Sequence, residues 1–308
     1  MTLLHLVGHD GTAHGDDALA VARTVGQGRD VRRTILHVIA FLGPTTVADA
    51  DRLKLSSETQ ERLRGIRDRL HADETLEVVL ASSPARGLHD RAEELEADLV
   101  AVGSRTWEPL GRELTPVAYR LLSGGPCSIL HAPAGYAERA HPLTHIVVGY
   151  DRSPEAGDAL AKAAALAAAT GTRVDVVHAH EQTADYLGYP VGYLGYLRAA
   201  YVTPDEIERA DEHAAQIAAD GLEAVPEALR GISAARHGTP GAVVDAFAVE
   251  RDADLVVLGS RGYGPLRRAL LGSASGHLLR HSDRPVLVLP RGSHATAPVT
   301  APQLAVAP

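Results

Sequence analysis

The sequence predicts an α/β protein of two tandem doubly wound domains, each with a parallel five-stranded sheet. Three observations support this: motifs of the first half recur in the second, short apolar runs alternate with helix-forming segments, and those runs are continuously apolar. Alternating strands and helices imply parallel strands joined by right-handed crossovers. Continuous apolar strands imply that helices cover both sheet faces.

The internal repeat is visible as matching motifs at a nearly fixed separation. LVGHD at residues 6–10 recurs as VVGYD at 147–151, an offset of 141. ADLV at 97–100 recurs at 253–256, an offset of 156. Two copies of one domain therefore lie in tandem, and the second copy carries an insertion.

The repeat also predicts the domain limits. The first copy covers 1–133, the second covers 143–290, and 134–142 is the linker between them. The extra residues of the second copy fall at 184–201, where many Tyr and Leu residues favour contact with a subunit or partner over a lid on the ligand or a plain loop. Residues 291–308 are rich in Pro and Ala, which predicts a disordered tail.

The second copy opens with a strand over 145–149, a short apolar run that ends in Gly. Ser153-Pro154 then offers an N-cap followed by proline at the first helical position. The Ala- and Leu-rich run 159–170 continues this helix until Gly171 ends it. Residues 174–178 form the second strand.

The remaining elements of the second copy keep this alternation. Residues 203–206 read Thr-Pro-Asp-Glu, a capping box that opens a helix reaching about residue 220. A further helix starts at Thr239-Pro240 and the last covers 273–280. The remaining strands are expected at 231–236, 255–258 and 286–289.

Composition excludes several classes of function. The formal net charge of -9 argues against non-specific binding to nucleic acid or to an anionic membrane. No apolar run approaches the roughly 18 residues that span a bilayer, and the N-terminus lacks the features of a signal peptide. Cys127 is the only cysteine, so a reducing, cytoplasmic location is expected. The 16 histidines form no HExxH motif, and the sequence identifies no metal ligands.

The expected ligand site lies where the order of the strands reverses. Open α/β sheets bind ligands at the carboxyl ends of their strands at such a point. With an assumed strand order of 3-2-1-4-5, the loop Gly149-Tyr150-Asp151 would meet the loop that begins at Gly259.

The loop after the fourth strand has the composition of a phosphate site. Gly259, Gly262 and Gly264 allow the backbone to approach a ligand and turn its amides inward, while Arg261 supplies positive charge. Glycines in this loop could also be ordinary turn residues. The spacing of the whole motif favours phosphate binding.

The same loop leads into a helix that begins at Gly272-Ser273. A helix N-terminus presents free N–H groups to an anion, here from Ser273, Ala274 and Ser275. The two serines add hydroxyl donors. Gly272 alone could be a simple capping glycine.

Residues after the first two strands would hold the rest of the ligand. Asp151 could accept hydrogen bonds from a ribose or an adenine amino group, or cap the following helix, and the two roles are compatible. The backbone of His178 and Ala179 could contact an adenine edge. For the side chains of His178 and His37 a structural role is favoured.

These residues resemble the universal stress protein family. Its ATP-binding members carry Gly, two residues, Gly, nine residues and then Gly-Ser or Gly-Thr, as Gly259, Gly262 and Gly272-Ser273 do here, and Asp151 matches the family's aspartate. The resemblance covers 1–133 and 143–290. It implies a Rossmann-like, adenine nucleotide alpha hydrolase-like fold that binds ATP, or alternatively ADP, with Mg²⁺ as a candidate metal.

The first copy departs from this pattern. Thr106 stands where Gly262 does, and Thr115-Pro116 replaces Gly272-Ser273. Proline removes an amide from the phosphate cradle, so we expect that the first copy does not hold ATP in the same way. Asp10 remains and would still allow an adenosine without phosphates to bind.

The working hypothesis is an ATP-binding stress-response protein that acts through self-association or a protein partner, with a homodimer expected. Two alternatives stay open: a slow Mg²⁺-dependent ATPase and a nucleotide-free dimerisation module. We also expect the two copies to pack as a pseudo-dimer through their last strands.

Overall fold

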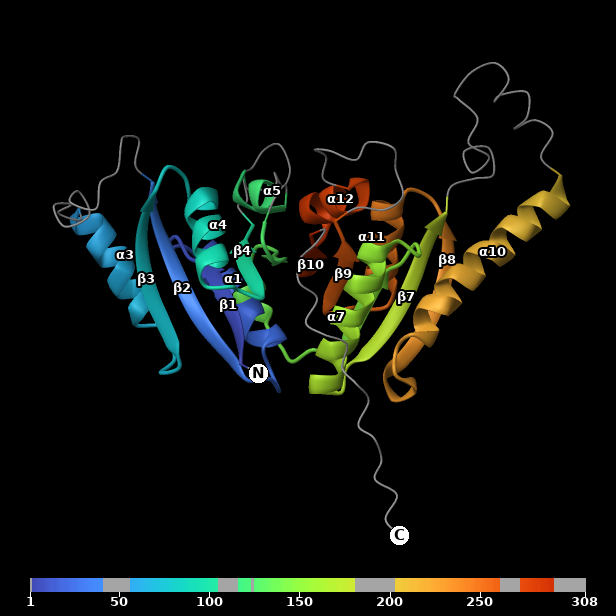
Figure 1. Ribbon diagram of the computed structural model, residues 1–308, viewed down its shortest axis with the longest axis horizontal. Helices are drawn as coiled ribbons and strands as arrows, with labels where there is room; N and C mark the ends of the chain where they lie inside the picture. Colours follow the sequence, from blue (N-terminus) through green and yellow to red (C-terminus); the bar gives the residue numbers. More distant parts are fainter. Residues whose placement is uncertain are drawn as a thin grey trace, which may run out of the picture.

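The strands of both copies form one continuous ten-stranded sheet (Figure 1). The computed structural model describes residues 2–40, 56–104, 116–122, 125–180, 203–260 and 272–290. The strand order is β3-β2-β1-β4-β5-β10-β9-β6-β7-β8, so each copy has the order 3-2-1-4-5 with parallel neighbours. The expected α/β class, the parallel sheets and the assumed order are confirmed.

The first copy alternates strands and helices throughout its described part. Its elements are β1 (Leu3–Gly8), α1 (Ala13–Val25), β2 (Val31–Ala40), α3 (Ser57–Arg67), β3 (Glu74–Ala81), α4 (Pro84–Glu94), β4 (Leu99–Gly103), α5 (Pro116–Leu122) and β5 (Ser128–Ala132).

The second copy repeats this order after a short helix, α6 (Tyr136–Arg139). Every strand and helix predicted for it is present. The elements are β6 (His145–Gly149), α7 (Pro154–Thr170), β7 (Arg173–His180), α10 (Pro204–Glu223), the 3-10 helix η1 (Glu227–Leu229), β8 (Arg230–His237), α11 (Pro240–Glu250), β9 (Leu255–Gly259), α12 (Ser273–His281) and β10 (Val286–Leu289).

Local capping explains where the helices begin and end. The Ser153 hydroxyl accepts a hydrogen bond from Ala156 N, and Gly171 ends α7 in the left-handed conformation with φ 73°. Thr203 and Glu206 form the predicted capping box, with both of its hydrogen bonds present. Thr239 precedes α11 without making a side-chain cap.

The two copies join through their last strands, as predicted. β5 and β10 pair antiparallel, and this places Leu130 directly opposite Leu287. All other strand pairs are parallel. The junction therefore removes the two edges that the separate sheets would otherwise expose.

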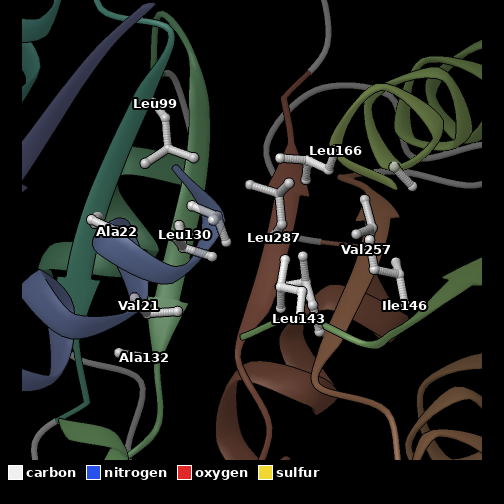
Figure 2. Close-up of a cluster of buried hydrophobic side chains, with 14 of the residues drawn as sticks. Val21, Ala22, Leu99, Leu130, Ala132, Leu143, Ile146, Leu166, Val257 and Leu287 are labelled. Atoms are coloured by element: carbon white, nitrogen blue, oxygen red, sulfur yellow. The ribbon is translucent and has the colours of Figure 1, made fainter. Parts of the chain in front are cut away.

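The core consists of two apolar layers, one on each face of the sheet, and both layers run through both copies. Figure 2 shows part of one layer, with Leu130 and Leu287 among residues from α1, α7 and the central strands. Val, Leu, Ile and Ala fill these layers almost entirely. The copies therefore share their core rather than meeting at a separate interface.

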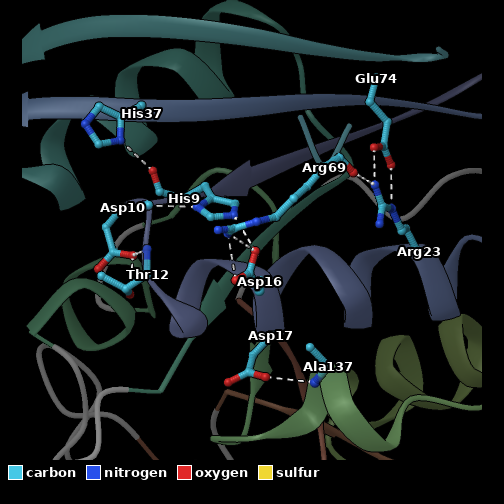
Figure 3. Close-up of polar contacts among 11 residues, drawn as sticks. His9, Asp10, Thr12, Asp16, Asp17, Arg23, His37, Arg69, Glu74 and Ala137 are labelled. Atoms are coloured by element: carbon cyan, nitrogen blue, oxygen red, sulfur yellow. Dashed lines mark hydrogen bonds and ion pairs between the residues drawn. The ribbon is translucent and has the colours of Figure 1, made fainter. Parts of the chain in front are cut away.

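The segment predicted as a linker is attached to the first copy. The carboxylate of Asp17, only 2% exposed, accepts hydrogen bonds from Gly135 N at 2.9 Å and from Ala137 N at 2.8 Å. Figure 3 shows the bond to Ala137. Tyr136 between them is buried. The start of α6 is thus held against α1. The predicted insertion at 184–201 and the predicted tail at 291–308 lie outside the described residues.

Among the helices that the structure describes, none has the length and apolar character that a membrane span requires.

Candidate functional site

The predicted switch point lies at the carboxyl end of β6. This strand pairs with β7 on one side and with β9 on the other. The residues that follow it therefore stand beside Gly259 and Ser260 at the end of β9. Gly272 N donates to Ser260 O at 3.0 Å, which holds the start of α12 against the same edge. Both ends of the Gly-rich loop are thus fastened together.

Most predicted site residues lie within the described part of the chain. Arg261, Gly262 and Gly264 lie outside it. The others gather at the carboxyl edge of β6, β7 and β9 and at the N-terminus of α12: Gly149, Tyr150, Asp151, His178, Ala179, Gly259, Gly272, Ser273, Ala274 and Ser275.

Asp151 does not cap α7 itself, because Ser153 is the N-cap, but it holds the turn that leads into this helix. Its Oδ1 atom accepts a hydrogen bond from Ser153 N at 2.9 Å and so shapes the turn into α7. Asp10 does the same in the first copy, accepting from the amide and hydroxyl of Thr12 (Figure 3). Burial opposes ionisation of Asp10, but these two hydrogen bonds outweigh it and lower the pKa of the carboxyl. The turn favours a charged carboxylate.

His178 has the structural role that was favoured for it. Its Nδ1 atom lies 2.8 Å from Tyr150 O, and His37 makes the same contact with His9 O in the first copy (Figure 3). A carbonyl only accepts, so Nδ1 carries the proton. Burial lowers the pKa of His178, which favours the neutral ring. The imidazole fixes the loop that carries Asp151.

The ring of Tyr150 is used for packing under α10. A Cβ atom placed on Gly221 of that helix would lie 2.7 Å from Cδ1 of Tyr150, so glycine lets the ring approach the helix closely. Tyr150 N donates to Val177 O at 3.0 Å. The residue therefore helps to position the site edge through its backbone.

Two glycines of the motif are explained by contacts within the protein. A Cβ atom on Gly259 would lie 2.7 Å from the backbone carbon of Glu155, because the first turn of α7 crosses the end of β9. A Cβ atom on Gly272 would lie 2.5 Å from Ser260 O. Both positions require glycine for close backbone packing, whether or not a ligand binds nearby.

The N-terminus of α12 presents backbone amides at this edge. Gly276 N donates to Gly272 O at 2.9 Å, so the amides of residues 273–275 precede the first helical hydrogen bond. The hydroxyl of Ser275 is buried and donates to Gly272 O at 3.1 Å. That hydroxyl fastens the loop, and the anion-binding capacity of this turn lies in its amides.

The first copy differs at the same place. Its corresponding helix, α5, begins at Pro116. Proline has no N–H, so this helix start offers one amide fewer than α12 does. Thr106 and Thr115 lie outside the described residues.

Sequence reasoning identified no metal ligands, but the fold brings three such side chains together. His180, Asp211 and His237 offer ligand atoms within 4.8 Å of one another. They are far apart in the sequence and form no motif, so only the strand register and the docking of α10 reveal the group.

Residues 5–133 and 142–290 each match the universal stress protein family. A universal stress protein of Thermus aquaticus is 35% identical over 144 residues, covering 47% of this chain and 96% of the relative. One from Mycolicibacterium smegmatis is 27% identical over 300 residues, covering 92% of this chain and 96% of the relative.

Solved structures agree with this result at the level of the fold. The crystal structure of a universal stress protein from Archaeoglobus fulgidus superposes with a TM-score of 0.64 at 21% identity and covers 94% of this chain and 98% of that one. The two family matches together span nearly all of both sheets. The chain therefore belongs to the universal stress protein family and carries two copies of the family's domain in tandem.

Proposed function

We propose that the second copy binds ATP and that the bound nucleotide regulates association of the protein with itself or with a partner. The observation that carries this proposal is the meeting of two features at one sheet edge. The amides of residues 273–275 open α12 beside the end of β9, and Asp151 follows the adjacent strand β6. A helix N-terminus attracts phosphate through its free amides and its dipole.

Each described residue has a defined task in this proposal. The α12 amides, with the loop that contains Gly262, would hold the phosphates. The carboxylate of Asp151, whose Oδ1 is oriented by Ser153 N, would accept from the ribose or the adenine amino group. The backbone at His178 and Ala179 would contact the base. Mg²⁺ would neutralise phosphate charge when bound, and Asp151 offers a carboxylate oxygen for it.

The two copies differ at the helix start where the phosphates would bind. α12 begins with Ser273 and keeps its first amide, whereas α5 begins with Pro116. One nucleotide per chain is therefore expected, bound in the second copy. A cytoplasmic location belongs to the same proposal and rests on Cys127 being the only cysteine of the sequence, which excludes an intrachain disulfide.

The first experiment measures adenine nucleotide released from the denatured purified protein. One ATP per chain supports a single competent site, and two would show that the first copy also binds. If the released nucleotide is mostly ADP, and if the protein shows Mg²⁺-dependent ATP turnover that Asp151→Ala abolishes, the protein is a slow ATPase rather than a regulator. If the protein releases no nucleotide even after soaking with ATP and Mg²⁺, it is a nucleotide-free interaction module.

A matched pair of variants assigns the site. Gly262→Val blocks the proposed phosphate loop, and Thr106→Val changes the corresponding position of the first copy. We expect at least a roughly tenfold loss of ATP affinity in Gly262→Val, because several amide contacts would be displaced. Thr106→Val should bind like the parent. If both variants fold and bind ATP with equal affinity, the phosphates do not bind at this loop.

A further inference from the structure

A cluster of two imidazoles and one carboxylate lies at the far edge of the second copy. It consists of His180, Asp211 and His237, hereafter the His-Asp-His cluster. His180 ends β7 and His237 ends β8, so both lie at the carboxyl ends of their strands. Asp211 lies on α10. No part of the proposed nucleotide site uses these three side chains.

The register of the sheet accounts for the pairing of the histidines. His180 and His237 are direct partners in the parallel ladder of β7 and β8, and partners in register project on the same face. Gly238 N donates to His180 O at 3.0 Å, which extends the pairing past the end of β8. The two rings lie 4.0 Å apart between centroids. Their relative position is thus set by the backbone.

The third group comes from the helix above these strands. α10 packs across both β7 and β8 and runs beside β8 in Figure 1. It places Oδ1 of Asp211 2.9 Å from Nε2 of His237 and 3.8 Å from Nε2 of His180. Two ligands of a tetrahedral ion at bond lengths of 2.0–2.1 Å lie about 3.3 Å apart. The two separations from Asp211 bracket that value, and all three ligand atoms lie within 4.8 Å of one another.

The hydrogen bonding of Asp211 gives a second indication. Its Oδ1 atom is shielded from solvent, yet within the described residues it receives no hydrogen bond of acceptable geometry, despite its short distance to His237. A buried carboxylate oxygen without a donor costs free energy that a bound cation would recover. The side chain of His180 is 7% exposed, whereas those of Asp211 and His237 are 46% and 48% exposed. The cluster thus has a closed inner side and an open outer side.

We propose that the His-Asp-His cluster binds a divalent transition metal, with Zn²⁺ as the ion that its ligands suit best. Two neutral imidazoles and a carboxylate are ligands that Zn²⁺ accepts, and three protein ligands leave a fourth position for water or another donor. Mg²⁺ prefers a set made of oxygens only, which this cluster does not offer. The site is therefore distinct in chemistry from a Mg²⁺–phosphate site.

The first copy supplies an internal contrast. At the corresponding offsets, Ile39 stands for His180 and Ala81 stands for His237. Both residues lie in the equivalent strands, β2 and β3, and neither can bind a metal ion. One metal ion per chain is therefore expected.

The test is titration of the full-length, chelator-stripped and nucleotide-free protein with Zn²⁺, in competition with a chromophoric chelator. Visible absorption of bound Co²⁺ reports the coordination geometry. We expect one tight site per chain and a tetrahedral Co²⁺ spectrum. His237→Ala and Asp211→Asn, each changing a partly exposed side chain, should weaken binding at least about tenfold.

His141→Ala is the matched control. His141 is 58% exposed and its Nε2 lies 3.4 Å from Oδ1 of Asp254, an imidazole–carboxylate pair outside the His-Asp-His cluster. This variant should bind Zn²⁺ like the parent. Absence of tight binding in the parent, or equal affinity in folded His237→Ala and Asp211→Asn, would overturn the proposal. Because no nucleotide is present, either result is independent of ATP binding.

Discussion

At the scale of single residues, buried charges in this protein mostly fix strands and loops. Asp175 on β7 is fully buried and accepts from Arg251 Nε at 2.7 Å and from Ile232 N at 2.8 Å. His145 lies between two acceptors, with Nε2 2.9 Å from Asp175 and Nδ1 2.8 Å from Arg251 O. Nδ1 donates to the carbonyl, and protonation of the ring places a positive charge beside the buried carboxylate. This arrangement joins the second copy's β6, β7 and α11.

The protonation of His145 predicts a pH dependence of stability. The contact with Asp175 raises the pKa of His145 above 6.5 despite burial. A raised folded-state pKa adds stability that is fully present below the unfolded pKa and is lost as pH rises through the folded value. Replacing His145 with Gln should therefore lower the free energy of unfolding most below about pH 6, with a loss that shrinks toward alkaline pH.

Urea unfolding of His145→Gln and the parent across pH 5.5 to 9 measures this difference. The exposed substitution His141→Gln serves as control and should show little difference at any pH. The Asp175 carboxylate determines how stability changes at acidic pH. Burial raises the pKa of Asp175, but hydrogen bonds from His145 and Arg251 outweigh burial and lower it, so its contribution is lost as pH falls through that depressed value. A loss independent of pH would show that His145 acts as a neutral ring.

At the scale of elements, the sequence predicted what local chemistry determines. Helix starts were readable because a capping residue precedes proline at Ser153, Thr203 and Thr239. The recurring ADLV motif marked the repeat, but its role became clear only in the structure. Asp98 accepts from Leu4 N in β1, and Asp254 accepts from the amides of Thr144 and His145 at the start of β6. That contact joins residues about one hundred positions apart, which no local pattern encodes.

The three-dimensional contacts of the site escaped sequence reasoning for the same reason. Gly259 was interpreted as a ligand-approach glycine and Gly272 as the start of the phosphate-binding helix, whereas their close neighbours within the protein include backbone atoms of Glu155 and Ser260. α6 was not predicted, because its position depends on the distant carboxylate of Asp17. Periodicity and capping thus located the site edge, and the packing that shapes it had to come from the fold.

The capping box at α10 predicts a measurable contribution to stability. In Thr203→Ala the side-chain bond to Glu206 N is lost, so the free energy of unfolding should fall by about 1 kcal/mol. Thr239→Ala is a close control, because Thr239 also precedes proline at a helix start but makes no side-chain cap. Its effect should be a few tenths of a kcal/mol. Equal losses in chemical denaturation would show that the box contributes nothing specific.

At the scale of the whole molecule, the two copies form one structural unit. The sheet is continuous through β5 and β10, and each apolar layer contains residues from both copies. Leu130 and Leu287, opposite one another at the junction, are both fully buried. The repeat predicted two similar domains and their pairing through the last strands. The extent of core sharing was not predictable, because it depends on side chains from both copies meeting across one sheet.

This shared core predicts that the two copies unfold together. The parent should give a single calorimetric transition, with equal van't Hoff and calorimetric enthalpies. Leu287→Ala should shift that whole transition to lower temperature, because it removes buried methyl groups at the junction and costs about 2–5 kcal/mol. Val249→Ala, at a position 60% exposed, should change stability by less than about 0.5 kcal/mol. If Leu287→Ala instead splits the transition and leaves one half at the parent's temperature, the first copy is stable on its own. The junction would then be a contact between independent domains rather than part of a common core.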